Sequence, residues 1–227
     1  CSSDLILHGH ELHGLDITDP TIPVIHHTYN INYTLPIKHH YDVVIHLAAL
    51  VNVGESVKYP KQYFKTNSFG TYNVLHDISH DHFILASTGA AVDCMSPYGF
   101  SKRLAEELVQ KYSKSYNIFR FYNVIGHTVK KPTNMDGIFY NLLQTKHTKK
   151  FTIYGNDYDT RDGTCIRDYV HVDEICHSIK NSLHDYTNDI HNLGHGKGTT
   201  VKELVDMYKS VNGLEFDVTY EIGRAHV

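Results

Sequence analysis

Apolar residues gather in short, nearly continuous runs in the first half of the chain. Residues 42–49 form one such run and end in small side chains, and residues 82–88 form another and end in hydroxyl groups. Runs of this kind are typical of parallel strands that are covered on both faces. Residues 116–123 predict a third strand, and residues 11–16 predict a shorter one that ends in an acid.

Between these runs, the spacing of apolar residues changes to that of a helix. Residues 62–76 have mixed helical spacing, and residues 103–109 place their apolar side chains on one side of a helix. Ser96 followed by Pro97 suits the start of that second helix, because proline fits the first turn. Strands that alternate with helices predict an α/β protein with a parallel sheet and right-handed connections.

The remaining segments are less regular. Residues 20–41 contain three prolines and are expected to be rich in turns. In the second half we expect, in chain order, a strand at 151–154, a polar loop at 155–164, a strand at 165–172, a helix at 174–183 capped by Asp173, and an amphipathic helix at 200–211.

Three predicted strands end in small or polar side chains. These strand ends are Ala48 and Ala49, Ser87 and Thr88, and Tyr122 and Asn123. Ligands of open parallel sheets bind beyond the carboxyl ends of the strands. We therefore expect these residues to converge on one crevice.

Tyr98 and Lys102 stand one turn apart at the start of the helix that follows Ser96. A phenol loses its proton near pH ~10, and a neighbouring ammonium lowers that value. Such a pair can move protons to and from a sugar hydroxyl. On the motif alone, however, the simpler interpretation is a helix with one exposed tyrosine and one exposed lysine.

Asp16 ends the short strand predicted at residues 11–16. In a dinucleotide-binding fold, an acid at the end of the second strand accepts hydrogen bonds from the adenosine ribose. The glycine-rich turn that precedes such a strand is not found in this sequence. Taken alone, Asp16 is better interpreted as a turn residue.

Composition narrows the class of protein. The chain has 227 residues, of which 41% are hydrophobic and 20% charged, as in ordinary globular proteins. A net charge of −4 gives no basic surface for nucleic acid, and no apolar run approaches the ~20 residues of a membrane span. The 4 cysteines and 19 histidines lack the spacing of metal ligands. We therefore expect reduced thiols, no metal, and neither nucleic acid nor membrane as a partner.

Several stretches, in chain order, resemble the UDP-glucose (UDP-galactose) 4-epimerase family of extended short-chain dehydrogenases/reductases. They are residues 42–49 with 53–57, 67–71, 96–102, 120–123, 155–172 and 192–198. Residues 155–172 are the most specific to that family. The resemblance implies a Rossmann-like, doubly wound parallel sheet that binds NAD over residues 1–125. It also implies a smaller, interleaved substrate-binding lobe over residues 126–227.

The resemblance also implies an activity, which is epimerisation at C4 of a UDP-hexose through a 4-keto intermediate. Tyr98 would take the proton of the 4-hydroxyl, while hydride passes from C4 to NAD and returns to the opposite face of the sugar. Lys102 would hold the nicotinamide ribose and lower the pKa of Tyr98, and Thr88 would hydrogen-bond the reacting oxygen. The family is usually dimeric, so a cytoplasmic homodimer is expected.

The same resemblance assigns the remaining site residues. The implied cofactor-binding residues are Asp16, Leu47, Ala48, Ala49, Asn67, Tyr98, Lys102 and Tyr122. The implied substrate-binding residues are Thr88, Asn123, Asn141, Leu142, Tyr154 and Arg167. An arginine that faces a diphosphate makes charge-assisted and often bidentate hydrogen bonds.

The sequence departs from the family pattern in three ways. The glycine-rich phosphate loop is absent, the connection from Thr88 to Tyr98 is short, and the family's C-terminal segment does not follow. We expect a fragment that has lost both ends and that, by itself, binds NAD poorly and turns over little substrate.

Two rival functions stay open. One is a sugar-nucleotide 4,6-dehydratase, although that class places an Asp-Glu pair after the active-site threonine, where this chain has Gly89 and Ala90. The other is a catalytically silent protein that binds NAD or nucleotide sugars on the same fold. The presence of Thr88, Tyr98 and Lys102 together speaks against it.

Overall fold

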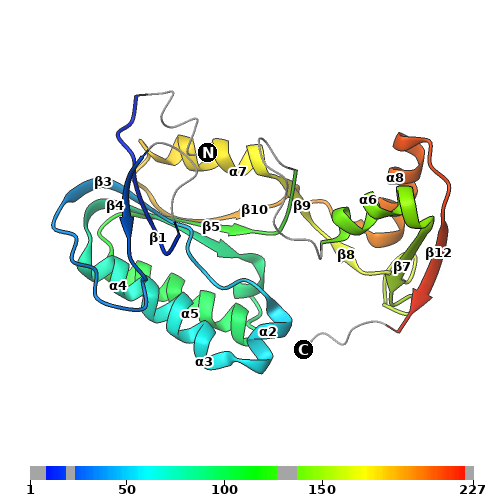
Figure 1. The fold of residues 1–227 in the computed structure, drawn as a ribbon, viewed down its shortest axis with the longest axis horizontal. Helices are drawn as coiled ribbons and strands as arrows, with labels where there is room; N and C mark the ends of the chain where they lie inside the picture. The colour runs from blue at the N-terminus through cyan, green and yellow to red at the C-terminus, as the bar shows by residue number, and fades with distance from the viewer. Residues whose placement is uncertain (1–8, 19–23, 127–136, 223–227) are drawn as a thin grey trace. The chain divides into compact units, whose positions relative to one another are not determined.

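The computed structural model describes residues 9–18, 24–126 and 137–222. The chain forms two compact units (Figure 1). The first comprises Cys1–Phe121 and Asp173–Leu193, and the second comprises Tyr122–Val172 and Gly194–His226. The sequence predicted a division at residues 125 and 126, whereas in the structure the segment Asp173–Leu193 groups with the first unit.

The first unit is built on a four-stranded parallel sheet. Its strand order is β10 (Asn188–Leu193), β5 (Tyr116–Phe121), β4 (Ser79–Thr88) and β3 (His40–His46). The middle of β4 is almost fully buried, because Phe83, Ile84 and Leu85 have at most 1% of their surface exposed. The prediction of an α/β fold with a parallel sheet is thus confirmed.

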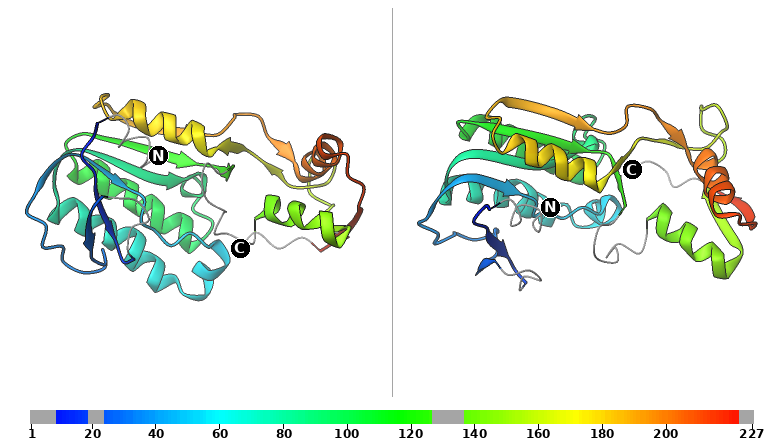
Figure 2. Two further views of the ribbon diagram at one scale, coloured as in Figure 1. Left: turned by 45° about the horizontal axis from the view of Figure 1, so that its top comes forward. Right: turned by 90° about the horizontal axis from the view of Figure 1, so that it is seen from above.

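Helices cover both faces of this sheet. Helix α7 (Val172–Ser182) lies on one face, and α4 (Gly70–Asp77) and α5 (Pro97–Tyr112) lie on the other (Figure 2). The core beneath α4 and α5 joins Val74, Leu75, Phe83, Leu85, Ala105, Val109 and Ile118. The sheet is therefore doubly wound, as the sequence predicted.

Residues 62–76, which were predicted as one helix, are divided between several elements. They span the end of α3 (Pro60–Tyr63), a π-helical turn at Phe64–Phe69, and most of α4. A Cβ atom at Gly70 would lie 2.7 Å from Ile31 Cδ1, so a larger residue here would displace the Ile31 side chain. Short π-helical turns are rare and occur frequently at functional sites. Before them, α2 (Val53–Lys58) begins at Asn52, whose side chain caps the helix.

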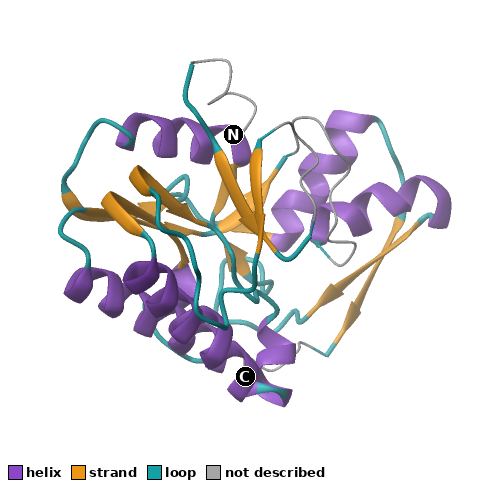
Figure 3. Ribbon diagram, turned by 60° about the vertical axis from the view of Figure 1, so that its left-hand side comes forward, coloured by secondary structure: helices purple, strands orange, loops and turns teal. Residues whose placement is uncertain are grey.

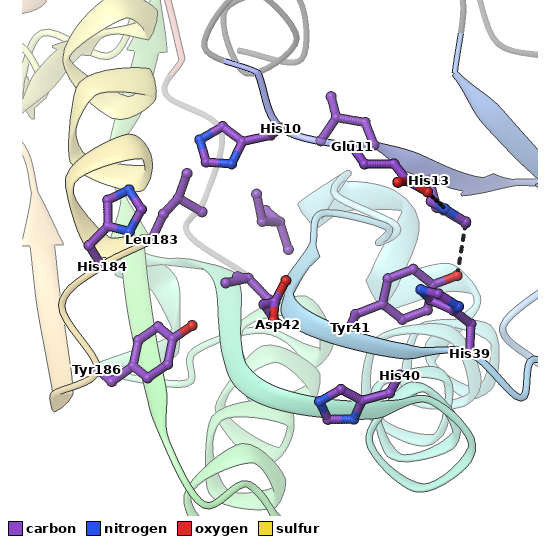
Figure 4. A pocket seen from close by; sticks show the side chains of 13 residues that line it. His10, Glu11, His13, His39, His40, Tyr41, Asp42, Leu183, His184 and Tyr186 are labelled. Atoms are coloured by element: carbon purple, nitrogen blue, oxygen red, sulfur yellow. Dashed lines mark hydrogen bonds and ion pairs between the residues drawn. The ribbon is translucent and has the colours of Figure 1, made fainter.

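A second, two-stranded parallel sheet pairs β1 (His13–Asp16) with β2 (Ile25–Thr28). Strand β2 was not predicted, because its sequence of isoleucine, two histidines and threonine shows little alternation. A cavity of about 400 Å³ lies in the first unit (Figure 4). It is lined by residues 10–13 at the start of β1, by residues of β3 and by Leu183, His184 and Tyr186 after α7. The Tyr41 hydroxyl and His13 Nδ1 share a hydrogen bond of 3.1 Å at this cavity. Side chains, rather than backbone pairing, thus connect the two sheets here.

The described part of the second unit contains two helices and three short strand pairs. Figure 3 draws the helices of the chain in purple and its strands in orange. The pairs are β6 (Asn123–Ile125) with β9 (Tyr169–His171), β7 (Lys150–Tyr154) with β12 (Asp217–Glu221), and β8 (Ile166–Arg167) with β11 (Thr199–Thr200). The helices are α6 (Ile138–Thr148) and α8 (Val201–Asn212). Their core includes Leu142, Phe151, Ile153, Leu204, Val205 and Phe216.

The helix predicted at residues 200–211 is confirmed as α8. Thr200 precedes it and accepts a hydrogen bond from the Glu203 backbone, while the Glu203 carboxylate accepts one from the Thr200 backbone, at 3.0 and 2.9 Å. This reciprocal pair is a capping box. It satisfies backbone groups that the start of a helix otherwise leaves unpaired.

Two predictions for this half of the chain are wrong. The strand predicted at 165–172 is broken at Asp168, whose carbonyl accepts hydrogen bonds from the Asn123 backbone and side chain at 3.0 and 2.8 Å. The Asp168 carboxylate accepts two more from the backbones of His195 and Gly196. Asp173 does not precede its helix, because α7 already begins at Val172.

Candidate active site

Tyr98 and Lys102 lie on one buried face of α5. Ser96 caps this helix by accepting a hydrogen bond from the Gly99 backbone at 3.1 Å, and Pro97 occupies the first turn, as predicted. Only 9% of Tyr98 and 3% of Lys102 are exposed. The simpler interpretation of two exposed side chains is therefore wrong, and the pair is held inside the first unit.

Thr88 and Tyr98 meet although the connection between them is short. The Thr88 hydroxyl lies close enough to the Tyr98 phenol to favour its ionised form and so lower its pKa in part. Thr88 ends β4 and starts a single 3₁₀ turn, Gly89–Ala91, which carries the chain back towards α5. A side chain at Gly99 would lie 2.3 Å from the Ala90 carbonyl oxygen, so glycine at this position lets the turn approach the helix.

The Lys102 side chain is bound to β4. Its ammonium donates a hydrogen bond of 2.6 Å to the carbonyl of Ala86 on β4. Burial lowers the pKa of Lys102 to about 8, and the Glu106 carboxylate opposes this shift. Burial raises the pKa of Tyr98, and the hydrogen bond with Thr88 opposes that increase in part. The expectation that Lys102 lowers the Tyr98 pKa is therefore wrong for this arrangement.

The carboxyl end of β3 presents an open surface. Leu47 is 57% exposed, Ala48 is exposed and Ala49 is half-buried. Small and apolar groups at a strand end allow a flat ring system to approach the backbone. This surface fits a dinucleotide, although its role stays a prediction.

The Asn67 side chain holds the loop that follows β3. It is fully buried, its amide oxygen accepts from the Leu50 backbone at 2.8 Å, and its nitrogen donates to the Leu50 carbonyl and to Ser101 at 2.9 and 3.0 Å. The Thr71 hydroxyl donates to the Asn67 carbonyl, so the buried His46 ring donates to Thr71 through Nε2. These hydrogen bonds occupy the side-chain amide of Asn67, which joins the loop after β3 to Ser101 on α5.

Asp16 forms a local turn at the end of β1. Its Oδ1 atom accepts hydrogen bonds from the Ile17 and Thr18 backbones at 2.6 and 3.2 Å, and from the Thr18 hydroxyl at 3.3 Å. The turn interpretation accounts for that oxygen. The predicted contact with a ribose stays a prediction.

The comparisons with known proteins agree with this geometry. The sequence profile of the family described as "NAD dependent epimerase/dehydratase family" matches residues 4–194. The chain belongs to this family.

Individual relatives give a finer comparison. The chain is 34% identical to UDP-glucose 4-epimerase of Mycoplasma genitalium over 207 residues, which cover 75% of this chain and 60% of that protein. It is 30% identical to UDP-glucose 4-epimerase of Rhizobium leguminosarum over 220 residues, which cover 82% of this chain and 67% of that protein. The chain thus spans about three fifths to two thirds of the length of these curated relatives.

A solved structure extends the similarity to the fold. The UDP-Glc/GlcNAc 4-epimerase of Campylobacter jejuni superposes with a TM-score of 0.76 at 26% identity. The match covers 99% of this chain and 83% of that one. The doubly wound sheet is therefore the fold of the epimerase/dehydratase family.

Apart from Thr88, the predicted substrate residues lie in the second unit. So does Tyr122, which was predicted to bind the cofactor and is 37% exposed just before β6. The Asn123 side chain donates a hydrogen bond to the Asp168 carbonyl. Tyr154 is 43% exposed at the end of β7. Asn141 and Leu142 lie on α6, and Arg167 lies on β8.

The structure gives these residues different surroundings. Leu142 is fully buried in the core of its unit, so packing is the role that the structure shows for its side chain. The Arg167 guanidinium donates to the Ile166 carbonyl at 3.2 Å and, within the described ranges, pairs with no carboxylate. The predicted roles toward a UDP-sugar stay predictions for an epimerase/dehydratase of this kind.

Sequence reasoning missed the polar groups behind Lys102. Ser87, Glu106 and the part-buried Arg120 form a hydrogen-bonded cluster, and the buried His46 lies near Lys102. Glu106 follows Lys102 by one helical turn, so helical spacing could have placed it on the same face. Its partner on β5 could not have been found that way, because the contact depends on strand pairing.

In the described part of the chain, no group of three or more His, Cys, Asp or Glu side chains is arranged to hold a metal ion. None of the helices in that part has both the length and the apolar character needed to cross a membrane.

Proposed function

We propose that this chain carries the catalytic residues of an NAD-dependent 4-epimerase that acts on a UDP-hexose such as UDP-glucose or UDP-galactose. The observation that carries the proposal is the buried constellation of Thr88, Tyr98 and Lys102 on β4 and α5. The names of the curated relatives support the same activity.

In the proposed reaction, Tyr98, Thr88 and Lys102 have separate roles. Tyr98 accepts the proton of the sugar 4-hydroxyl and returns it, while the Thr88 hydroxyl orients the reacting oxygen. NAD, held by Lys102 and by the loop at Leu47–Ala49, would supply the hydride acceptor. Because burial raises the pKa of Tyr98, its phenolate depends on donors such as Thr88 for stabilisation.

A conversion assay tests this proposal. The complete gene product, incubated with NAD and UDP-galactose, is expected to form UDP-glucose. A product with a 4-keto-6-deoxy sugar would instead identify a dehydratase. Binding of NAD and UDP without turnover would identify a silent binding protein.

Arg167 provides a separate test of substrate recognition. In the complete gene product, Arg167→Ala should weaken UDP binding by about 1.5–3 kcal/mol, because charge-assisted hydrogen bonds to a diphosphate are lost. NAD affinity should change little. Calorimetric titration with UDP and with NAD measures both, and an unchanged UDP affinity would remove Arg167 from the binding residues.

We also infer a cytoplasmic homodimer. Phe69 is 64% exposed and Phe100, on α5, is 51% exposed, which favours a partner surface on this side of the first unit. In the described part of the chain, Cys94, Cys165 and Cys176 form no disulfide, in keeping with a reducing compartment. Sedimentation equilibrium is expected to give twice the monomer mass, and a monomer at micromolar concentration would contradict the dimer.

A further inference from the structure

A buried carboxylate lies one helical turn beyond Lys102. Glu106 has no exposed surface, and its position four residues after Lys102 places both on the same face of α5. Its carboxylate accepts a hydrogen bond of 2.5 Å from the Ser87 hydroxyl. It also accepts two from the Arg120 guanidinium, at 2.9 and 2.7 Å. This is the bidentate geometry in which arginine binds carboxylates most strongly.

Three adjacent residues of β4 meet three successive turns of α5. The pairs are Thr88 with Tyr98, Ala86 with Lys102, and Ser87 with Glu106. Arg120 stands directly opposite Ser87 in the β4–β5 register, so its contact with Glu106 extends the attachment to a second strand. Glu106 thus fixes the helix to the end of the strand that carries Thr88.

Few titratable or charged groups surround the Lys102 ammonium in the described residues. Tyr98 and Glu106 come from its own helix, His46 comes from β3, and Arg120 from β5 stands behind Glu106. Burial and the Lys102 charge lower the pKa of His46 to about 3, so the imidazole is neutral. Among these groups in the described residues, Glu106 is the anion that favours an ammonium at Lys102.

We propose that Glu106 is a positioning residue for the Tyr98–Lys102 pair. Held by Ser87 and Arg120, its carboxylate keeps the buried Lys102 protonated and in place. The importance of this for catalysis rests on the proposed function, in which the Lys102 ammonium meets the cofactor. The electrostatic coupling itself can be measured without substrate or cofactor.

Glu106→Gln changes the charge and keeps the shape. The variant removes the negative charge and leaves the Arg120 guanidinium without this carboxylate. Both changes disfavour a positive charge on Lys102. The pKa of Lys102 should therefore fall below its value of about 8, by about one unit or more.

The pH dependence of unfolding tests this directly. The folded Lys102 has a pKa of about 8 against an ordinary value of 10.5, so between these values the unfolded chain binds more protons. The stability contribution of this lysine therefore rises with pH through that window. The Lys102→Met variant removes the rise, and the difference between the two curves isolates the contribution of Lys102.

We expect the rise of stability with pH that Lys102 causes to begin at a lower pH in Glu106→Gln. When Glu106→Gln is compared with and without Lys102→Met, the rise should begin about one pH unit or more lower than in the parent protein. Glu107→Gln is the matched control, because this exposed neighbour on α5 pairs with Arg103 instead. It should leave the rise where it is.

A merely structural role for Glu106 would lower stability at every pH and leave the rise unmoved, and that result would overturn the proposal. So would an equal displacement in Glu107→Gln. If Glu106→Gln does not fold, the double variant Glu106→Gln with Arg120→Met removes both charges of the pair and should give a smaller displacement in the same direction. An unmoved rise there would also overturn the proposal. None of these outcomes bears on the proposed function, which turnover tests.

Discussion

Replacement of Tyr98 by phenylalanine is expected to reduce turnover of UDP-galactose in the complete gene product by ~100- to ~10,000-fold, which is the usual contribution of a positioned proton-transfer group. The substitution removes one oxygen and leaves the buried ring in place. UDP-sugar affinity should change little, because the phenol acts mainly in the transition state. Steady-state kinetics and calorimetric titration measure the two effects separately.

Tyr112→Phe is the matched control for this experiment. Tyr112 is 58% exposed at the end of the same helix, and the chemical change is identical. Its turnover should equal that of the parent protein. Parental turnover in Tyr98→Phe would exclude Tyr98 as the proton-transfer group, and equal losses in both variants would point to a general disturbance of α5.

Replacement of Lys102 by methionine is expected to abolish turnover and yet stabilise the fold. Burial lowers the Lys102 pKa from 10.5 to about 8. Below pH 8, the charged lysine is therefore less favourable in the folded state than in the unfolded state, where it is solvated. The penalty is on the order of 3 kcal/mol, and the lost hydrogen bond to Ala86 offsets about 1 of it. At pH 7 the net gain should be about 2 kcal/mol.

The sign of this effect can be checked through its pH dependence. The advantage of Lys102→Met should be fully present below pH 8 and should shrink as pH rises towards 10.5, where the unfolded lysine also becomes neutral. Lys111→Met, which removes an exposed lysine from the same helix, should change stability by less than about 0.5 kcal/mol. A destabilised Lys102→Met variant at pH 7 would show that the buried ammonium is well compensated.

Sequence patterns predicted the sheet because its strands are buried on both faces. The runs at residues 42–49 and 82–88 became β3 and β4 for that reason. Strand β2 was missed because its two central histidines interrupt the apolar pattern that is typical of a strand. The strand at 165–172 was predicted unbroken because the hydrogen bonds that bend it at Asp168 come from Asn123, His195 and Gly196, which are distant in sequence.

The candidate site shows the same limit. Local spacing placed Tyr98 and Lys102 on one face of a helix, and that placement is confirmed. Spacing could not reveal that Lys102 would bind the Ala86 carbonyl, because that contact depends on how the helix packs on β4. The buried pair of Glu106 and Arg120 was invisible for a similar reason, since a charged residue in a sequence is ordinarily assigned to the surface.

We propose that the complete gene product carries out epimerisation at C4 and that the hydride removed from C4 returns to the same carbon. The direct measurement uses UDP-galactose that carries deuterium at C4, incubated with the complete gene product and NAD, with the product followed by NMR. We expect UDP-glucose that retains deuterium at C4. A 4-keto-6-deoxy product, deuterium exchanged for solvent hydrogen, or no conversion by protein that binds both NAD and UDP would contradict it.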